Sequence, residues 1–192
     1  MARLPAFHGK WWNHAELKNK DWMVQIDNQA FYGTAVNAAC NAAARINDLY
    51  DNAVLSNELM AYANRNIDKI MAYLGTRPFT FVHGDYHAKQ MFFPTESGGK
   101  FAVIDWQFPF VASGAWDFAR MLGMGLPSVR RRELEPALLK GYCDGLITNG
   151  VSHYSQEELE VDYRLGLFIS QLIMCIAHGD TDVEIMEKEC RV

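Results

Sequence analysis

Two neighbouring stretches carry most of the information in this sequence. The first reads His83-Gly84-Asp85-Tyr86-His87-Ala88-Lys89-Gln90, and the second reads Ile104-Asp105-Trp106-Gln107. A short β-prone run, residues 79–82, precedes the first stretch. Between the two stretches lie two more such runs, residues 91–93 and 101–104, which are joined by the turn-rich segment 94–100. Two such runs, separated by a connection rich in Pro, Ser and Gly, are typical of a β-hairpin. We therefore expect a small hairpin near the middle of the chain, with a polar stretch at each of its ends.

The hairpin geometry brings two polar side chains together. In an antiparallel pair the residue before the first strand lies beside the residue after the second, so Gln90 and Asp105 should meet at the open end. An amide oxygen and a carboxylate are hard ligands of the kind that Mg²⁺ takes, together with substrate phosphates and water. Asp85 lies in the loop that enters the hairpin and can reach the same place. These groups suit phosphoryl transfer, which needs positioning and charge neutralisation more than covalent help.

The first part of the chain is predicted to be helical. Residues 34–74 are rich in alanine, and from Leu59 to Leu74 the apolar residues recur every three or four positions. Ser56 is a candidate N-cap, and Gly75 followed by Pro78 is a stop signal.

The last part is also predicted to be helical. The chain returns to helix after Gly114, and a further helix should begin between Ser128 and Pro136, because a proline fits a first turn better than an interior. Ser155 and Glu158 form a capping box that should start a final helix.

We therefore predict an α+β, predominantly helical fold with a small central β-hairpin. The chain is interpreted as a single helical lobe, residues 1–192. Its parts are a helical segment at 1–75, a loop and hairpin at 79–106, and a second helical segment at 114–178.

Composition excludes several classes of protein. The chain has 192 residues, of which 49% are hydrophobic and 21% are charged, as in ordinary globular proteins. Its net charge of −5 is unfavourable for sequence-independent nucleic-acid binding. No two of the four cysteines are spaced as a Cys-x-x-Cys pair, and the longest apolar stretch, residues 165–177, is too short to span a bilayer. We expect a cytoplasmic protein with neither a nucleic acid nor a membrane as partner.

Four motifs, in this order and spacing, resemble the C-terminal catalytic lobe of protein-kinase-like small-molecule phosphotransferases. That family includes aminoglycoside phosphotransferases, choline kinases and ecdysteroid-kinase-like proteins. His83-Gly84-Asp85 resembles its catalytic-loop motif, and Ile104-Asp105-Trp106 resembles its metal-binding motif. Gly114 to Ala119 resembles the Gly-x-x-Asp-Leu-Ala segment, and Leu4 to Trp12 resembles the helix that follows the hinge. The resemblance covers essentially the whole chain.

The resemblance implies an enzyme that transfers the γ-phosphate of ATP to a hydroxyl of a small molecule. By this likeness Asp85 is the catalytic base or hydroxyl-orienting group. Asp105, with Gln90, would bind Mg²⁺ and so the nucleotide phosphates. His83 would be an internal strut of the catalytic loop, and Asp117 would anchor the backbone of that loop.

Two further residues of the first stretch are candidates by the same likeness. His87 stands where protein kinases carry a lysine that touches the transferred phosphate, and Lys89 is a candidate for cofactor binding. No residue in the sequence selects among possible acceptors.

The sequence departs from the family pattern in two ways. Gln90 stands where the family usually has Asn, so its amide is displaced by about 1.5 Å, one C–C bond, and metal binding should be weaker or altered. The residues before Pro78 show neither a glycine-rich loop nor a strand lysine. We expect that the nucleotide-gripping N-terminal lobe is missing and that the chain alone is inactive. The face left by that lobe could then support a homo-oligomer.

Two alternative functions are open. His83, Asp85 and His87 alternate, so on a strand they would share one face and could form the zinc or iron triad of a metallohydrolase. Gly84 begins a loop, however, and the triad leaves Asp105 unexplained. The second alternative is a non-catalytic, pseudokinase-like module that binds a partner or substrate, which the amide at Gln90 and the expected absence of a lobe favour.

Overall fold

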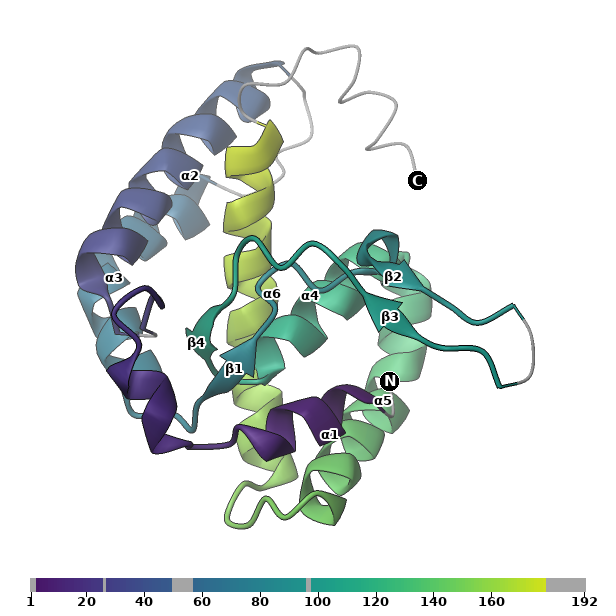
Figure 1. The fold of residues 1–192 in the computed structure, drawn as a ribbon. Coiled ribbons are helices and arrows are strands. Elements are labelled where there is room, and N and C mark those ends of the chain that lie inside the picture. Colours follow the sequence, from purple (N-terminus) through teal and green to yellow (C-terminus); the bar gives the residue numbers. More distant parts are fainter. Residues whose placement is uncertain (1–2, 26, 50–56, 96–97, 179–192) are drawn as a thin grey trace. The chain divides into compact units, whose positions relative to one another are not determined.

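The computed structural model describes residues 3–25, 27–49, 57–95 and 98–178, and its fold is α+β and predominantly helical, as the sequence predicts (Figure 1). The α-helices are α1 (Arg3–Lys10), α2 (Gln29–Leu49), α3 (Asn57–Gly75), α4 (Ala115–Gly125), α5 (Ser128–Thr148) and α6 (Gln156–His178). The short 3₁₀ helices are η1 (Ala15–Asn19) and η2 (Ala88–Gln90). The strands are β1 (Thr80–Val82), β2 (Met91–Phe92), β3 (Ala102–Val103) and β4 (Phe110–Ala112).

The chain forms two compact units. The first comprises Met1–Ile26 and Arg77–Leu167, and the second comprises Asp27–Thr76 and Phe168–Val192. Helices α2 and α3 pack against each other within the second unit. Every candidate site residue of the sequence analysis belongs to the first unit. None of the described helices is both long and apolar enough to cross a lipid bilayer.

The strands of the first unit form two antiparallel pairs. β2 pairs with β3, with Met91 opposite Val103, which confirms the predicted hairpin. β1 pairs with β4, with Phe81 opposite Val111. The sequence analysis anticipated β1 as a β-prone run but missed β4, because three residues are too few to show an alternating pattern. That strand depends on a partner distant in sequence and on the burial of Val111, which is 1% exposed.

The helical predictions hold with one correction. The described residues of the stretch predicted as helix over 34–74 belong to α2, which already begins at Gln29, and to α3, which ends at Gly75 as expected. The proposed cap Ser56 lies outside the described residues.

The correction concerns Pro136, which lies inside α5 and not in its first turn, although α5 does begin within the predicted interval at Ser128. A proline there frees the carbonyl of Arg132. Both residues are exposed, so water can bind that carbonyl. The helix continues because Leu139 and Leu146, further along, are buried in the core.

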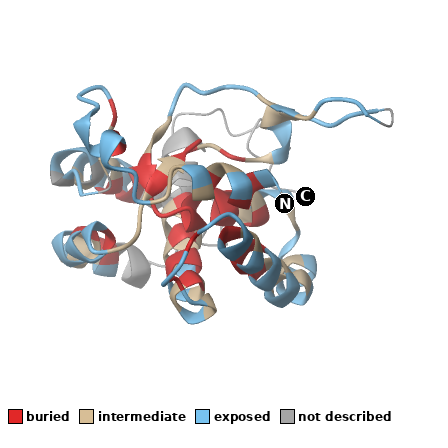
Figure 2. Cartoon of the chain, turned by 60° about the horizontal axis from the view of Figure 1, so that its bottom comes forward, coloured by how far each residue is buried: buried red, intermediate tan, exposed pale blue. Residues whose placement is uncertain are grey.

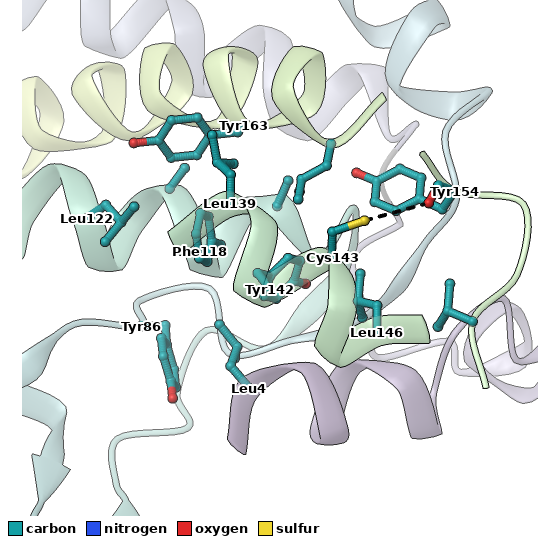
Figure 3. Packing of buried hydrophobic residues seen from close by; sticks show 14 residues of the cluster. Leu4, Tyr86, Phe118, Leu122, Leu139, Tyr142, Cys143, Leu146, Tyr154 and Tyr163 are labelled. Atoms are coloured by element: carbon teal, nitrogen blue, oxygen red, sulfur yellow. Dashed lines mark hydrogen bonds between the residues drawn. The ribbon is translucent and has the colours of Figure 1, made fainter. Parts of the chain in front are cut away.

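A buried cluster joins α1, α4, α5 and the start of α6 in the first unit (Figure 3). Phe118 from α4 packs on Tyr142 from α5 at a ring-centroid distance of 4.7 Å, and Tyr163 packs on the Phe118 ring at 5.6 Å. Burial of this kind contributes roughly 1.5–3 kcal/mol for each large side chain. By contrast, the β2–β3 ribbon is coloured largely as exposed in Figure 2. The packed cluster, and not the ribbon, therefore holds α4 in place.

The start of α6 has the capping box that the sequence predicts. The Glu158 backbone N–H donates to Ser155 Oγ at 3.2 Å, and the Ser155 backbone N–H donates to Glu158 Oε2 at 2.9 Å. Two backbone donors that have no partner within the helix are thereby satisfied.

Replacing Ser155 by Ala should lower the free energy of unfolding by about 1 kcal/mol, because the Glu158 N–H loses its acceptor. Chemical unfolding measures this change. The matched control is Ser152→Ala, at an exposed position three residues earlier, which should lie within about 0.5 kcal/mol of the parent. Equal effects of the two substitutions would contradict the capping assignment.

Candidate active site

The loop after β1 requires glycine at its second position. Gly84 has φ +86°, and a Cβ there would overlap the carbonyl oxygen of Phe108. Only glycine adopts this backbone without strain and allows so close an approach. The loop that carries Asp85 is thereby held against the segment between β3 and β4.

A buried carboxylate fixes the backbone of this loop. Asp117, in the first turn of α4, is 0% exposed. Its Oδ2 accepts the His83 N–H at 2.7 Å and its Oδ1 accepts the Gly84 N–H at 3.0 Å. The Trp116 indole N–H adds a third bond, to the Gly84 carbonyl at 3.1 Å. The first turn of α4 therefore binds the backbone N–H groups of His83 and Gly84 and also the carbonyl of Gly84.

His8 on α1 supports Asp117 from behind. Its Nε2 lies 3.3 Å from Asp117 Oδ2, and its Nδ1 lies 2.6 Å from the Tyr142 hydroxyl. An ionised carboxylate only accepts hydrogen bonds, so the His8 proton belongs on Nε2 and the Tyr142 hydroxyl donates to Nδ1. Burial, with nearby negative charge, raises the pKa of Tyr142 well above its usual value, so the hydroxyl remains protonated. All three side chains are buried.

The His83 ring joins the two stretches. Its Nε2 donates to the Ile104 carbonyl at 2.8 Å, and its Nδ1 accepts the Asp85 N–H at 3.3 Å. The ring is 0% exposed and lies 4.6 Å from the Trp106 ring, centroid to centroid. Both ring nitrogens are therefore engaged within the protein.

Gln90 and Asp105 meet at the open end of the hairpin, as the antiparallel geometry predicts. Gln90 Nε2 donates to Asp105 Oδ2 at 2.7 Å and lies 3.5 Å from Asp85 Oδ2. Asp105 is exposed and has φ +64°, an uncommon backbone conformation for a residue other than glycine. Two carboxylates and one amide thus converge beside the ribbon.

Asp85 is held by a charged partner. Arg120 on α4 donates to Asp85 Oδ1 through Nε at 2.9 Å and through Nη2 at 2.6 Å. The His87 Nε2 lies 3.3 Å from Asp85 Oδ2. Burial raises the pKa of Asp85, but the hydrogen bonds and charge of Arg120, with smaller effects of His87 and Gln90, outweigh it and lower the pKa overall. Asp85 is therefore a carboxylate at neutral pH.

The other predicted site residues lie around this centre. The His87 side chain is 14% exposed and contacts Asp85. Lys89 is exposed on η2 and makes none of the contacts described above. The structure thus brings Asp85, His87, Gln90 and Asp105 together and places Lys89 outside the group.

The sequence analysis missed two residues of the site, Arg120 and His8. Arg120 follows Asp117 by three positions on a helix, a spacing that places both on one face and could have revealed it. His8 meets Asp117 and Tyr142, which are 109 and 134 residues away in the chain. No local pattern encodes those contacts.

The side chains available at this site fit some metal ions better than others. Within the described part of the chain, no group of three or more His, Cys, Asp or Glu side chains could hold a metal ion. The His83–Asp85–His87 triad therefore has no support, in keeping with the engagement of both His83 nitrogens. One carboxylate and one amide, at Asp105 and Gln90, fit Mg²⁺ in kind, because this ion takes one or two protein ligands and fills its shell with phosphate and water.

Together these features describe an α+β, mainly helical protein with an acidic site at the end of a β-ribbon. Residues 24–189 match the family DUF1679, described as "Uncharacterized oxidoreductase dhs-27", and the chain belongs to this family. No curated protein and no solved structure matches the chain.

Replacing Gly84 by Ala should destabilise the fold by at least about 1–3 kcal/mol, because the positive φ strains any L-residue and the new Cβ meets the Phe108 carbonyl. The control is Gly141→Ala on α5, where nothing lies within 4 Å of the added Cβ. There the change should stabilise the protein by about 0.5–1 kcal/mol. Denaturant unfolding of both variants tests this difference in sign, and a neutral Gly84→Ala would show that the loop is not confined.

Proposed function

We propose that this chain is the catalytic lobe of an ATP-dependent phosphotransferase whose acceptor is a hydroxyl group of a small molecule. The observation that carries the proposal is the meeting of Asp85, Gln90 and Asp105 at the end of the β2–β3 ribbon. It is supported by the rigid attachment of the Asp85 loop to α4 through Asp117. Phosphoryl transfer depends mainly on such positioning and on charge stabilisation.

Asp85 is proposed to bind and orient the acceptor hydroxyl. The hydroxyl donates to the carboxylate, its oxygen forms a bond to the γ-phosphorus of ATP, and the bond from that phosphorus to the ADP oxygen breaks. The acceptor proton passes to Asp85, which later releases it to solvent. The lowered pKa of Asp85 favours a carboxylate that orients the hydroxyl and accepts its proton late in the reaction.

Asp105 and Gln90 are the residues that would hold Mg²⁺. When bound, this ion would neutralise charge on the nucleotide phosphates. Gln90 presents its amide nitrogen to Asp105 in the hydrogen bond described above, and the oxygen and nitrogen of an amide exchange places by a half-turn of the group. Lys89, exposed on the same short helix, is proposed to meet the phosphates from outside the carboxylate group.

The description of the family as an oxidoreductase invites comparison with a dinucleotide-binding fold. That fold uses a parallel sheet and a Gly-x-Gly-x-x-Gly turn that opens a helix. The sequence has no such motif, and the sheets of the described residues are two-stranded and antiparallel. These features favour the phosphotransferase proposal.

A second candidate function is a non-catalytic binding module. It is favoured by the contacts within the site, because the side chains pair with one another: Arg120 with Asp85, and Gln90 with Asp105. Such a module would bind nucleotide or substrate without turnover, and the experiment below separates the two functions.

Mg-ATP at about 100 times its dissociation constant should stabilise the protein by about 2.7 kcal/mol. Asp105→Asn should remove most of this gain, because the proposed metal ligand loses its charge. Thermal unfolding, performed on the longest natural polypeptide that carries these residues, measures the effect. The exposed residue Asp21 supplies the control, since Asp21→Asn should retain the full gain.

Asp85→Asn should keep the Mg-ATP stabilisation but lower ADP release, in the presence of a panel of small alcohols, by roughly 10²–10⁴-fold. Stabilisation without ADP release from the unmodified protein would favour the binding module. The absence of any effect of Mg-ATP would exclude the phosphotransferase and a module that binds nucleotide.

A further inference from the structure

We infer that Arg120 is a positioning residue of this site, which holds Asp85 Oδ1 and leaves Oδ2 as the oxygen that meets the acceptor hydroxyl. The inference rests on the proposed function and adds to it a residue and an assignment of the two carboxylate oxygens. It stands on the hydrogen-bond geometry around Asp85 and on the burial of Arg120.

Arg120 donates its hydrogen bonds to one of the two carboxylate oxygens of Asp85. Both Nε and Nη2 donate to Asp85 Oδ1, at 2.9 Å and 2.6 Å. A planar guanidinium that donates twice to a single oxygen fixes its direction more firmly than a single bond can. The side chain of Arg120 is 7% exposed, so it has little freedom to move.

The second oxygen is held more loosely. Oδ2 lies 3.3 Å from His87 Nε2 and 3.5 Å from Gln90 Nε2. Both distances exceed the 2.7–2.9 Å typical of strong charge-assisted bonds. The Asp85 side chain is 22% exposed. A hydroxyl group can therefore approach Oδ2 and donate a short hydrogen bond to it.

Helix α4 makes this arrangement rigid. Asp117 and Arg120 lie one turn apart, and they hold the same loop at two points. Asp117 binds the backbone N–H groups of His83 and Gly84, whereas Arg120 binds the side chain of Asp85. The helix itself is buried along most of its length. Movement of Asp85 would therefore require movement of a packed helix.

The remaining nitrogen of Arg120 argues against a purely structural ion pair. Nη1 is buried and has no hydrogen-bond partner among the residues that the structure describes. A buried donor without a partner costs free energy, which a pair selected for stability alone would avoid. The cost is consistent with an arginine whose orientation is set by Asp85.

The charged groups that face Asp85 come from three elements. Arg120 faces it from α4, His87 from its own loop, and Asp105 through Gln90 from the end of β3. Only Arg120 makes two short bonds. In Arg120→Met both bonds to Oδ1 would be lost, so the carboxylate would no longer be held in one direction.

The test determines the position of the Asp85 carboxylate by crystallography and, in parallel, kcat and KM for ATP. In Arg120→Met the carboxylate should leave its position, and kcat should fall on the order of 10²-fold, as for a misplaced catalytic group, with KM changed less than about twofold. Arg120→Lys keeps the charge but lacks the planar fork, so its kcat should also fall. The control is Arg131→Met, which breaks an ion pair with Glu135 on α5 and should alter neither kcat nor the position of Asp85.

The outcomes separate this inference from the proposed function. An Asp85 carboxylate that keeps its position in folded Arg120→Met overturns the inference, whatever the activity. Should Arg120→Met not fold, Arg120→Lys decides, and a kcat equal to that of the unmodified protein overturns it. An unmodified protein that releases no ADP rejects the proposed function, whereas the position of Asp85 still shows whether Arg120 controls the carboxylate.

Discussion

A single buried carboxylate holds the site together. Asp117 accepts two consecutive backbone N–H groups, of His83 and Gly84, and contacts His8 on the opposite side. Charge-assisted bonds of this kind are roughly twice as strong as neutral ones, and removing a buried acceptor leaves its donors unpaired. The bonds join the loop after β1 to α4, which the aromatic cluster around Phe118 fixes in turn. The position of Asp85 thus depends on a residue that never meets solvent.

The β2–β3 hairpin positions the other two side chains of the site, Gln90 and Asp105. It brings Gln90 and Asp105, 15 residues apart, within hydrogen-bonding distance, and the His83 ring connects its second strand to the loop through the Ile104 carbonyl. The ribbon itself is short and largely exposed, so its register alone would not fix these side chains. The rigidity comes from α4, and the Gln90 and Asp105 side chains come from the ends of the ribbon. The proposed phosphoryl transfer would need both.

Sequence patterns predicted the elements of this structure that depend on interactions between residues close together in the chain. The hairpin, the stop at Gly75 and the capping box at Ser155 all follow from spacing and turn chemistry. What the sequence did not reveal depends on distant contacts. β4 exists through its pairing with β1, and Pro136 remains inside α5 because the burial of Leu139 and Leu146 further along the helix outweighs propensity. Arg120 could have been found, since it follows Asp117 at helical spacing.

Amide hydrogen exchange provides the sharpest test that Asp117 holds the loop. In the unmodified protein the His83 and Gly84 amides should be protected, because both donate to a buried carboxylate. In Asp117→Asn, a side-chain NH₂ faces at least one of these donors. Loss of about 1–3 kcal/mol should therefore speed local exchange by about fivefold or more, beyond any change at Leu146 in the core. Unchanged exchange at both amides would contradict the account, since the loop would then be held by something other than Asp117.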